Sequence, residues 1–177
     1  MVDLAAITMV RDIVTILGVV GGFTYYVMTV RNANRARKNQ IIMEIRNQLL
    51  DKETIHDRME LLETSWNDYD DFLTKYDSTV NIENYAKRLR WWHFYDGIGY
   101  QISLGLIDLE SVYYLLGPHS ILLFWNKFKS IIVKQRELFD NPEMYKWFEY
   151  LANETSKMRV KRGLKPEVTD ADGYLSK

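Results

Sequence analysis

His93 and Asp96 are the residues whose types and spacing best fit catalytic chemistry. They stand three apart in an aromatic, mostly apolar stretch that also holds Trp92 and Tyr95. Because residues three apart share one face of a helix, this imidazole and carboxylate could shuttle a proton or hold a metal ion. A polar contact inside a protein core is the commoner use of such a pair, and we favour it. An enzyme using the His93 and Asp96 region is therefore the least favoured of our hypotheses.

The carboxylate of Asp96 interrupts an apolar helix and needs a partner if it is buried. Arg136 ends another apolar segment that must pack in the same core, and Arg88 and Arg90 are further candidates. Removing one member of a buried pair leaves an uncompensated charge, which is strongly destabilising. We therefore predict a structural ion pair between Asp96 and Arg136.

Other signatures of catalysis or cofactor binding are missing from the sequence. Glu53 and His56 have the Glu-x-x-His spacing that di-iron bundles use twice, but no second copy occurs. The chain has no Cys, which removes disulfides, thiolate metal sites and Cys nucleophiles. It also has no phosphate-binding glycine loop and no serine elbow. The sequence predicts no catalytic residue, no metal ligand and no cofactor.

Charge is arranged in blocks along the chain. Residues 31–50 carry five bases and one acid, whereas residues 51–83 carry ten acids and three bases. Residues 88–95 mix bases with aromatic residues, a composition that can stack on nucleotides. The alternating blocks do not form one basic footprint, so we expect no nucleic-acid partner.

Residues 13–30 are eighteen consecutive residues without a charge. As a helix they extend roughly 27 Å, close to the hydrocarbon thickness of a bilayer at about 30 Å. One base, Arg11, precedes this span and four follow it within eight residues. The four are Arg31, Arg35, Arg37 and Lys38. Positive charge resists translocation, so we predict a single-pass protein of the cell membrane with its N-terminus outside and its C-terminal domain cytoplasmic. The four bases are expected to contact lipid headgroups.

Three alternatives for this apolar stretch are less favoured. A cleaved signal peptide carries its bases before the apolar run, and here they follow it. A buried core helix would show an amphipathic stripe, which the stretch lacks. An interfacial helix needs a polar face, and the stretch offers only three threonines. We therefore favour a transmembrane helix.

Glycines are the second feature of the span. Gly18 and Gly22 stand four apart, a spacing that lets two membrane helices approach closely. We predict that they form a packing face for a protein partner or for a second copy of the chain, with ordinary membrane-helix glycines as the alternative. Gly97 and Gly99, farther along, are expected to allow close helix packing.

The remainder of the chain has helical periodicity and no strand alternation. Residues 51–77 form one acidic amphipathic helix in this interpretation. Asn81, Asp108 and the pair Asn141–Pro142 are typical of helix starts, whereas Gly105 and Gly117 are typical of helix ends. The sequence thus predicts an all-α fold, in which one N-terminal transmembrane helix precedes a bundle of four to six helices.

This interpretation divides the chain into four parts. Residues 1–30 form the N-terminal segment with the transmembrane helix, and residues 31–50 form a basic juxtamembrane helix that can continue the span. Residues 51–162 form the cytoplasmic helical domain. Residues 163–177 are polar and aperiodic and are expected to be a disordered tail.

Several short motifs between Tyr95 and Leu151 occur together in an order that we recognise. They are Tyr95-Asp96-Gly97, Gly105-Leu106-Ile107-Asp108, Leu116-Gly117, Trp125, Arg136 and Phe148-Glu149-Tyr150-Leu151. This set resembles an uncharacterised prokaryotic family of small membrane-anchored all-helical proteins, classed as a domain of unknown function. The resemblance implies a short N-terminal span ahead of the helical part, and it transfers no catalytic residue.

Together these features favour a membrane-tethered, non-enzymatic helical interaction module. Residues 51–77, which are acidic, and residues 157–165, which are basic, are its expected protein-contacting surfaces. The alternative is an accessory subunit of a larger membrane protein complex. In that case the glycines of the span would pack against partner helices.

Overall fold

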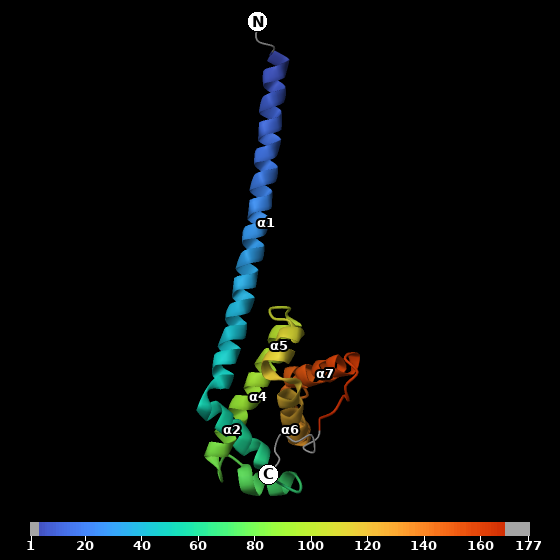
Figure 1. Cartoon of the computed structure of the whole chain (residues 1–177). Helices are drawn as coiled ribbons and strands as arrows, with labels where there is room; N and C mark the ends of the chain where they lie inside the picture. The colour runs from blue at the N-terminus through green and yellow to red at the C-terminus, as the bar shows by residue number, and fades with distance from the viewer. Residues whose placement is uncertain (1–3, 169–177) are drawn as a thin grey trace. The chain divides into compact units, whose positions relative to one another are not determined.

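A computed structural model describes residues 4–168 of the chain, and these residues form an all-α structure (Figure 1). The helices are α1 (Leu4–Leu50), α2 (Lys52–Glu63), α3 (Tyr69–Tyr76), α4 (Ile82–Ser103), α5 (Leu109–Leu116), α6 (Pro118–Leu138) and α7 (Lys146–Lys161). No strand occurs within residues 4–168. The predicted all-α class is confirmed, and the six helices after α1 match the upper limit of the predicted number.

The chain divides into two compact units, Met1–Ile41 and Ile42–Lys177. Helix α1 is unbroken across this boundary, so the basic segment 31–50 continues the apolar helix as the sequence allowed. One window of α1 is long and apolar enough to cross a membrane, and none of that window is buried. This exposure argues against the alternative of a buried core helix. The end of α1 belongs to the second unit, where Ile45 is buried.

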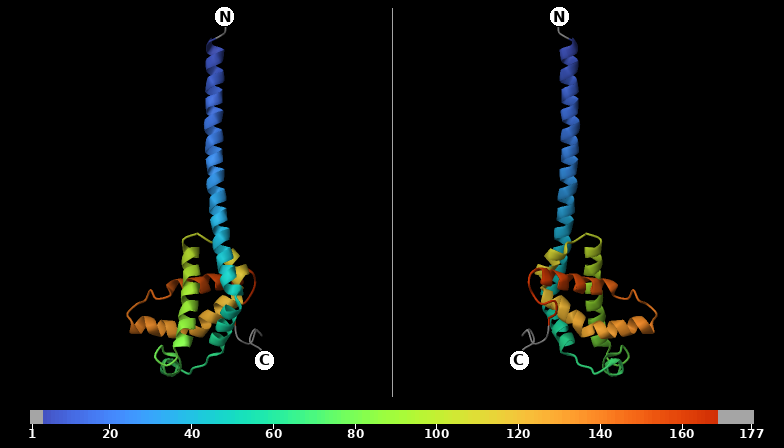
Figure 2. Two further views of the ribbon diagram at one scale, coloured as in Figure 1. Left: turned by 90° about the vertical axis from the view of Figure 1, so that its left-hand side faces the viewer. Right: turned by 90° about the vertical axis from the view of Figure 1, so that its right-hand side faces the viewer.

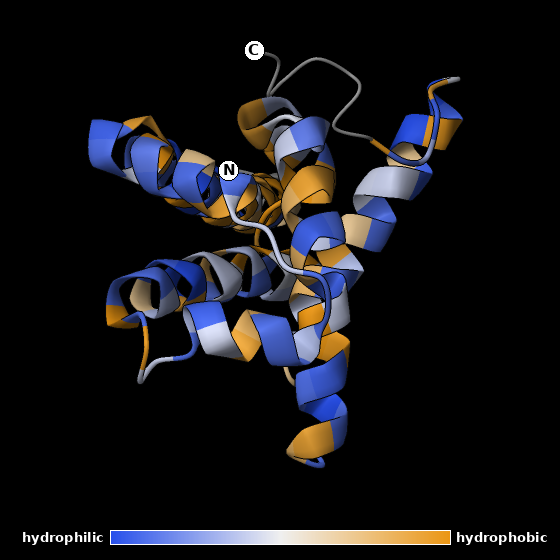
Figure 3. Ribbon diagram, turned by 90° about the horizontal axis from the view of Figure 1, so that it is seen from below, coloured by the Kyte–Doolittle hydropathy of each residue, from blue (hydrophilic) through white to orange (hydrophobic). Residues whose placement is uncertain are grey.

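Aromatic side chains of α4, α6 and α7 form the centre of the second unit. Tyr95, Phe124 and Phe148 are fully buried, and the rings of Tyr95 and Phe148 stack with centroids 4.9 Å apart. Figure 3 shows apolar residues gathered on the inner faces of these helices and polar residues on the outer faces. The high aromatic content of the sequence therefore supplies a core, because each buried ring removes a large apolar area from water.

Helix α7 crosses α4 at Gly99 (Figure 2). A Cβ atom added to Gly99 would lie 1.9 Å from the carbonyl oxygen of Trp147, so the backbones approach too closely for any side chain. The expected packing role is confirmed for Gly99. At Gly97 nothing lies within 4 Å of an added Cβ atom, so the helix does not require glycine there.

Most helix boundaries follow local capping residues. Asn81 accepts a hydrogen bond from the backbone N–H of Asn84, and Asp108 accepts one from that of Ser111. Gly117 has a φ of 72°, which ends α5 directly before α6. A side-chain acceptor satisfies an N–H group that the helix leaves unpaired, so these helix starts can be predicted from the sequence.

Two predicted boundaries are wrong. Residues 51–77 form α2 and α3 rather than one helix, because Asp68 caps a new start by accepting from the N–H of Asp71. Helix α7 begins at Lys146, several residues after the predicted Asn141–Pro142 start. The intervening residues form turns.

The predicted disordered tail is partly packed. Ser156 of α7 donates to the carbonyl oxygen of Pro166 at 3.0 Å, and Val168 is buried. Residues 163–168 therefore return to the helical domain, although they contain no helix. The rest of the predicted tail, 169–177, lies outside the described residues.

Candidate functional site

Asp96 holds the first turn of α7. Its Oδ1 atom accepts hydrogen bonds from the backbone N–H groups of Trp147 at 2.9 Å and Phe148 at 3.0 Å. The first N–H groups of a helix have no partner inside it and carry partial positive charge, which suits a carboxylate. A residue fifty-one positions earlier therefore supplies the cap that α7 lacks locally.

The predicted ion pair between Asp96 and Arg136 is wrong, because each residue has a different partner. Arg136 pairs with Glu149 at 2.6 Å and donates to the carbonyl oxygen of Met144 at 2.8 Å. Both predicted residues therefore stabilise the beginning of α7, but from separate contacts. Asp96 meets backbone N–H groups, which neutralise a carboxylate without a second charged side chain.

His93 does not join Asp96 in a polar site. Its side chain is exposed, and its ring lies edge-on to that of Tyr145 with centroids 5.3 Å apart. The carboxylate of Asp96 is occupied by the start of α7. The two residues share a face of α4, and both contact the beginning of α7: His93 contacts Tyr145, and Asp96 caps the helix.

Tyr145 has a strained backbone next to this cap. Its φ of 52° lies in the left-handed region, which is unfavourable for a residue with a bulky side chain. Its ring packs edge-on against Trp92 with centroids 5.2 Å apart, and burial raises the pKa of its hydroxyl to about 12. Such strain persists only where the surroundings fix it, and it is frequent at ligand-binding sites.

Tyr145 borders a pocket of about 480 Å³ between α3, α4, the end of α6 and the turn before α7. Arg88 lies at the base of this pocket and is only 2% exposed. Its guanidinium donates to Asn84 Oδ1 at 2.9 Å and to the carbonyl oxygen of Tyr76 at 3.1 Å. It also lies over the ring of Phe72, 4.6 Å from the centroid.

Arg88 has no carboxylate partner among residues 4–168 within 4.0 Å. Burial lowers the pKa of its guanidinium to about 10, because an apolar environment disfavours the charged form. The sequence analysis did not identify this pocket. The available signal was the spacing of Tyr85, Arg88 and Trp92, which places two aromatic rings on the same helix face as the cation.

Lys87, the preceding residue, has the opposite environment. Its Nζ atom lies 2.7 Å from Glu60, 2.8 Å from Glu83 and 3.4 Å from Asp57. These hydrogen bonds, strongest with Glu60 and Glu83, raise the pKa of the Lys87 ammonium above its ordinary value. His56, Asp57 and Glu60 could present three ligand atoms within 4.8 Å of one another to a metal. The Lys87 ammonium already contacts both of these carboxylates, those of Asp57 and Glu60.

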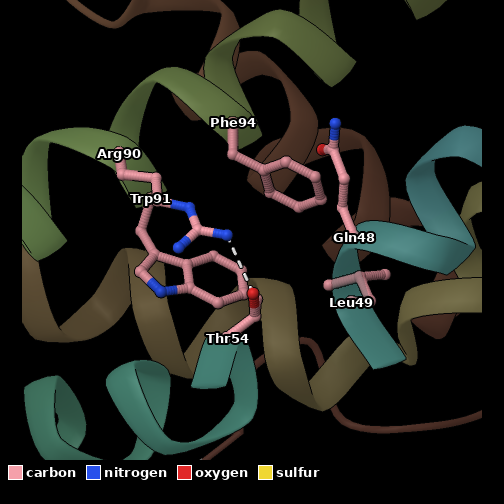
Figure 4. A pocket seen from close by; sticks show the side chains of 6 residues that line it. All are labelled: Gln48, Leu49, Thr54, Arg90, Trp91 and Phe94. Carbon is pink, nitrogen blue, oxygen red and sulfur yellow. Dashed lines mark hydrogen bonds between the residues drawn. The ribbon is translucent and has the colours of Figure 1, made fainter. Parts of the chain in front are cut away.

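A second pocket of about 350 Å³ lies between the end of α1, the start of α2 and α4 (Figure 4). The aromatic rings of Trp91 and Phe94 face the side chains of Gln48 and Leu49 across it. The Arg90 guanidinium donates to Thr54 Oγ1 at 2.8 Å, shown as the dashed line. The side chain of Arg90 is 53% exposed, so its guanidinium remains hydrated.

The charged stretches expected to contact partners are largely used within the domain. In the acidic stretch 51–77, Asp68 caps α3 and Asp71 pairs with Lys75 at 2.9 Å. In the basic stretch 157–165, Arg162 pairs with Glu110 at 3.0 Å. Much of this charge therefore stabilises the fold.

The predicted site residues of α1 are exposed. Nothing lies within 4 Å of a Cβ atom added at Gly18 or Gly22. The side chains of Arg31, Arg35 and Arg37 are exposed as well, and that of Lys38 is partly exposed. Their predicted contacts, with another helix and with lipid headgroups, involve other molecules and stay predictions.

One family matches most of the chain. The family described as a domain of unknown function (DUF4760) matches residues 5–155, which include α1 to α6 and most of α7. No curated protein and no solved structure matches the chain.

Proposed function

We propose that this chain, which belongs to the family described as a domain of unknown function (DUF4760), is a membrane-tethered, non-enzymatic helical interaction module. One observation carries the proposal. An exposed apolar segment of α1, residues 13–30, continues without a break into a basic segment, residues 31–38. An apolar helical segment followed directly by basic residues is typical of a membrane anchor.

The exposure of this apolar segment is unfavourable in water. Leu17 is 66% exposed, Val19 is 67% exposed and Phe23 is 69% exposed. Apolar surface in water costs about 25 cal/mol per Å², which a bilayer removes. A lipid environment is therefore the surrounding that best stabilises this part of α1.

The basic segment supports one orientation. Bases that follow a span hold their side of the chain in the cytoplasm, because moving them across the membrane is unfavourable. We accordingly place the helical domain in the cytoplasm, with Arg31, Arg35, Arg37 and Lys38 at the lipid headgroups. Each base contributes on the order of 1 kcal/mol near an anionic surface.

The contacts of Asp96 favour a structural role over a catalytic one. Its carboxylate accepts two backbone hydrogen bonds at the start of α7, so it is engaged in holding that helix. The ring of His93 lies edge-on to that of Tyr145, and His93 does not share a polar site with Asp96. The two residues with the best catalytic spacing are thus structural in their contacts.

Alkaline extraction of membranes, combined with reporter fusions to the C-terminus, tests this proposal. The chain should remain in the membrane pellet, and a reporter that is active only in the cytoplasm should be active. Replacing Arg31, Arg35, Arg37 and Lys38 together with Asn should reduce correct orientation. A matched set in the helical domain, Lys129, Lys134, Lys157 and Lys161, should have no effect. Recovery of the unmodified chain in the soluble fraction would refute the anchor.

The open space around Gly18 and Gly22 favours a second candidate, an accessory subunit of a larger membrane complex. Gly22→Leu should then separate the chain from its partners in a mild detergent, measured by size and by mass spectrometry of the proteins that co-purify. Val20→Leu, on another face of the helix, is the control. Equal assembly sizes for the two variants would remove this candidate.

A further inference from the structure

The buried guanidinium of Arg88 is stabilised mainly by uncharged groups. Its two hydrogen-bond acceptors are an amide oxygen and a backbone carbonyl. Aromatic faces also contact it, with its Cζ atom 4.6 Å from the Phe72 centroid and 5.4 Å from that of Trp92. The Asp77 carboxylate attracts it from beyond ion-pair distance. These groups attract a cation but do not neutralise it, so an anion placed beside it would be strongly favoured.

The two hydrogen bonds of Arg88 do not use all of the N–H donors of its guanidinium. A guanidinium has five N–H groups in a planar fork, and that shape matches the oxygens of a carboxylate. Because Arg88 is one of the residues that line the pocket of about 480 Å³, a ligand held in the pocket lies beside this side chain.

The walls of the pocket suit an aromatic or apolar body. Tyr69, Tyr85 and Tyr145 contribute rings with hydroxyl groups, and Leu138 and Phe139 stand at the end of α6. Leu138 is 56% exposed and Phe139 is 64% exposed, so apolar surface at this pocket still faces water. Ligand pockets commonly combine such surface with a few polar groups that fix orientation.

Asp77 is the charged group that also borders the pocket. Its carboxylate accepts from the backbone N–H of Thr79 at 2.9 Å and from its hydroxyl at 2.8 Å. The pKa of Asp77 is lowered by these bonds, so it stays ionised. It therefore favours ligands with a single negative charge, directed at Arg88, over multiply charged ones.

We propose that this pocket binds a small organic acid, with its carboxylate against Arg88 and its aromatic or apolar body among the tyrosines. The proposal goes beyond a membrane-tethered interaction module, since it gives the domain a ligand of its own. It also accounts for the strained backbone of Tyr145, which directs that ring to the pocket wall.

Binding of 2-naphthoate and of 2-naphthamide to the full chain in nanodiscs of zwitterionic lipid tests the proposal. The two compounds have the same shape and differ in charge. Isothermal titration calorimetry should give a dissociation constant at least about tenfold lower for 2-naphthoate, as expected for a hydrogen-bonded charge. Empty nanodiscs measure partition into lipid. Equal affinities, or no binding by either compound at millimolar concentration, would overturn the proposal.

Two variants locate the site. Arg88→Met should abolish the preference for 2-naphthoate, whereas Arg90→Met, which borders the other pocket, should retain it. Ser78→Trp fills the pocket without removing the cation and should weaken binding of both compounds at least about tenfold. It keeps the test decisive if Arg88→Met does not fold. Unchanged binding to Ser78→Trp would place the ligand elsewhere and refute the assignment.

Discussion

Lys87 and Arg88 are neighbours on α4, yet the regions around them differ in how charge is balanced. Around Lys87 three carboxylates surround one ammonium, and the side chain is 15% exposed. Around Arg88 no carboxylate lies within ion-pair distance in the described part of the chain, and the residue is 2% exposed. One side of the helix has more negative charge than its cation needs, and the other has less.

This difference in charge balance indicates which of the two regions is available to an external anion. Lys87 already has three carboxylate partners, so its region gains little from a further anion. A buried cation has lost its water, and any anion that reaches it replaces what burial removed. Residue type alone would have ranked these two bases equally.

Removing Arg88 should produce the largest effect. Arg88→Ala leaves Tyr76 O and Asn84 Oδ1 without their donor and opens a void beneath Phe72. We expect a loss of about 3 kcal/mol in the free energy of unfolding. Thermal unfolding of the full chain in detergent, followed by near-ultraviolet circular dichroism, measures it. Arg88→Met fills the space and should lose less, and an unchanged transition for Arg88→Ala would mean that the side chain is not buried as described.

Asp96 allows the same comparison for an anion of α4. Asp96→Ala removes the cap of α7, and caps contribute about 0.5 to 2 kcal/mol. We expect a loss near the upper end, because the cap joins α4 to α7. Asp96→Asn should keep part of the stability, since its amide oxygen can still accept both hydrogen bonds. If alanine and asparagine at this position were equally stable, the hydrogen bonds to Trp147 and Phe148 would not be contributing.

Lys87→Met should have a smaller effect, of about 1 kcal/mol, as expected for a partly hydrated ion-pair cluster. Its effect should depend on pH. The hydrogen bond from Lys87 lowers the pKa of Glu83, so this contribution is present above the ordinary value of 4.5 and is lost as the pH falls below it. Unfolding temperatures of both proteins should therefore converge in acid. A difference that stayed constant down to about pH 3 would contradict this linkage.

Arg90→Met should have the smallest effect, below about 0.5 kcal/mol, because surface substitutions rarely change stability more. The side chain is 53% exposed and its contacts with Thr54 and Asp57 compete with water. The same unfolding measurement applies. A loss as large as that of Arg88→Ala would show that exposure does not separate these bases.

Much of the secondary structure was accessible from the sequence. The caps at Asn81 and Asp108 and the break at Gly117 are confirmed, because each capping group lies within three residues of the helix end that it serves. The division of residues 51–77 into two helices was missed, although Asp68 is a capping residue type. Apolar periodicity runs through this break and concealed it.

The functional region was less accessible. Asp96 was identified as a residue that needs a partner, but its partners are backbone groups at Trp147 and Phe148. Arg88 was considered as a partner for Asp96 and as part of a stretch that could stack on nucleotides, but not as the cation of a pocket. Its pocket combines α3, α4, the end of α6 and the turn before α7. Spacing along one helix cannot show what a distant helix places opposite it.

The sequence by itself determined the all-α class, the apolar segment of α1 and the basic segment that follows that segment within the same helix. These features depend on local hydrophobic periodicity and on charge order, which are properties of neighbouring residues. The tertiary structure decided that Asp96 caps α7 and that Lys87 lies among three carboxylates, while Arg88 is buried with no carboxylate of residues 4–168 within ion-pair distance. Hydrogen bonds and desolvation depend on which groups the packed helices bring together, and here those groups are up to fifty-two residues apart.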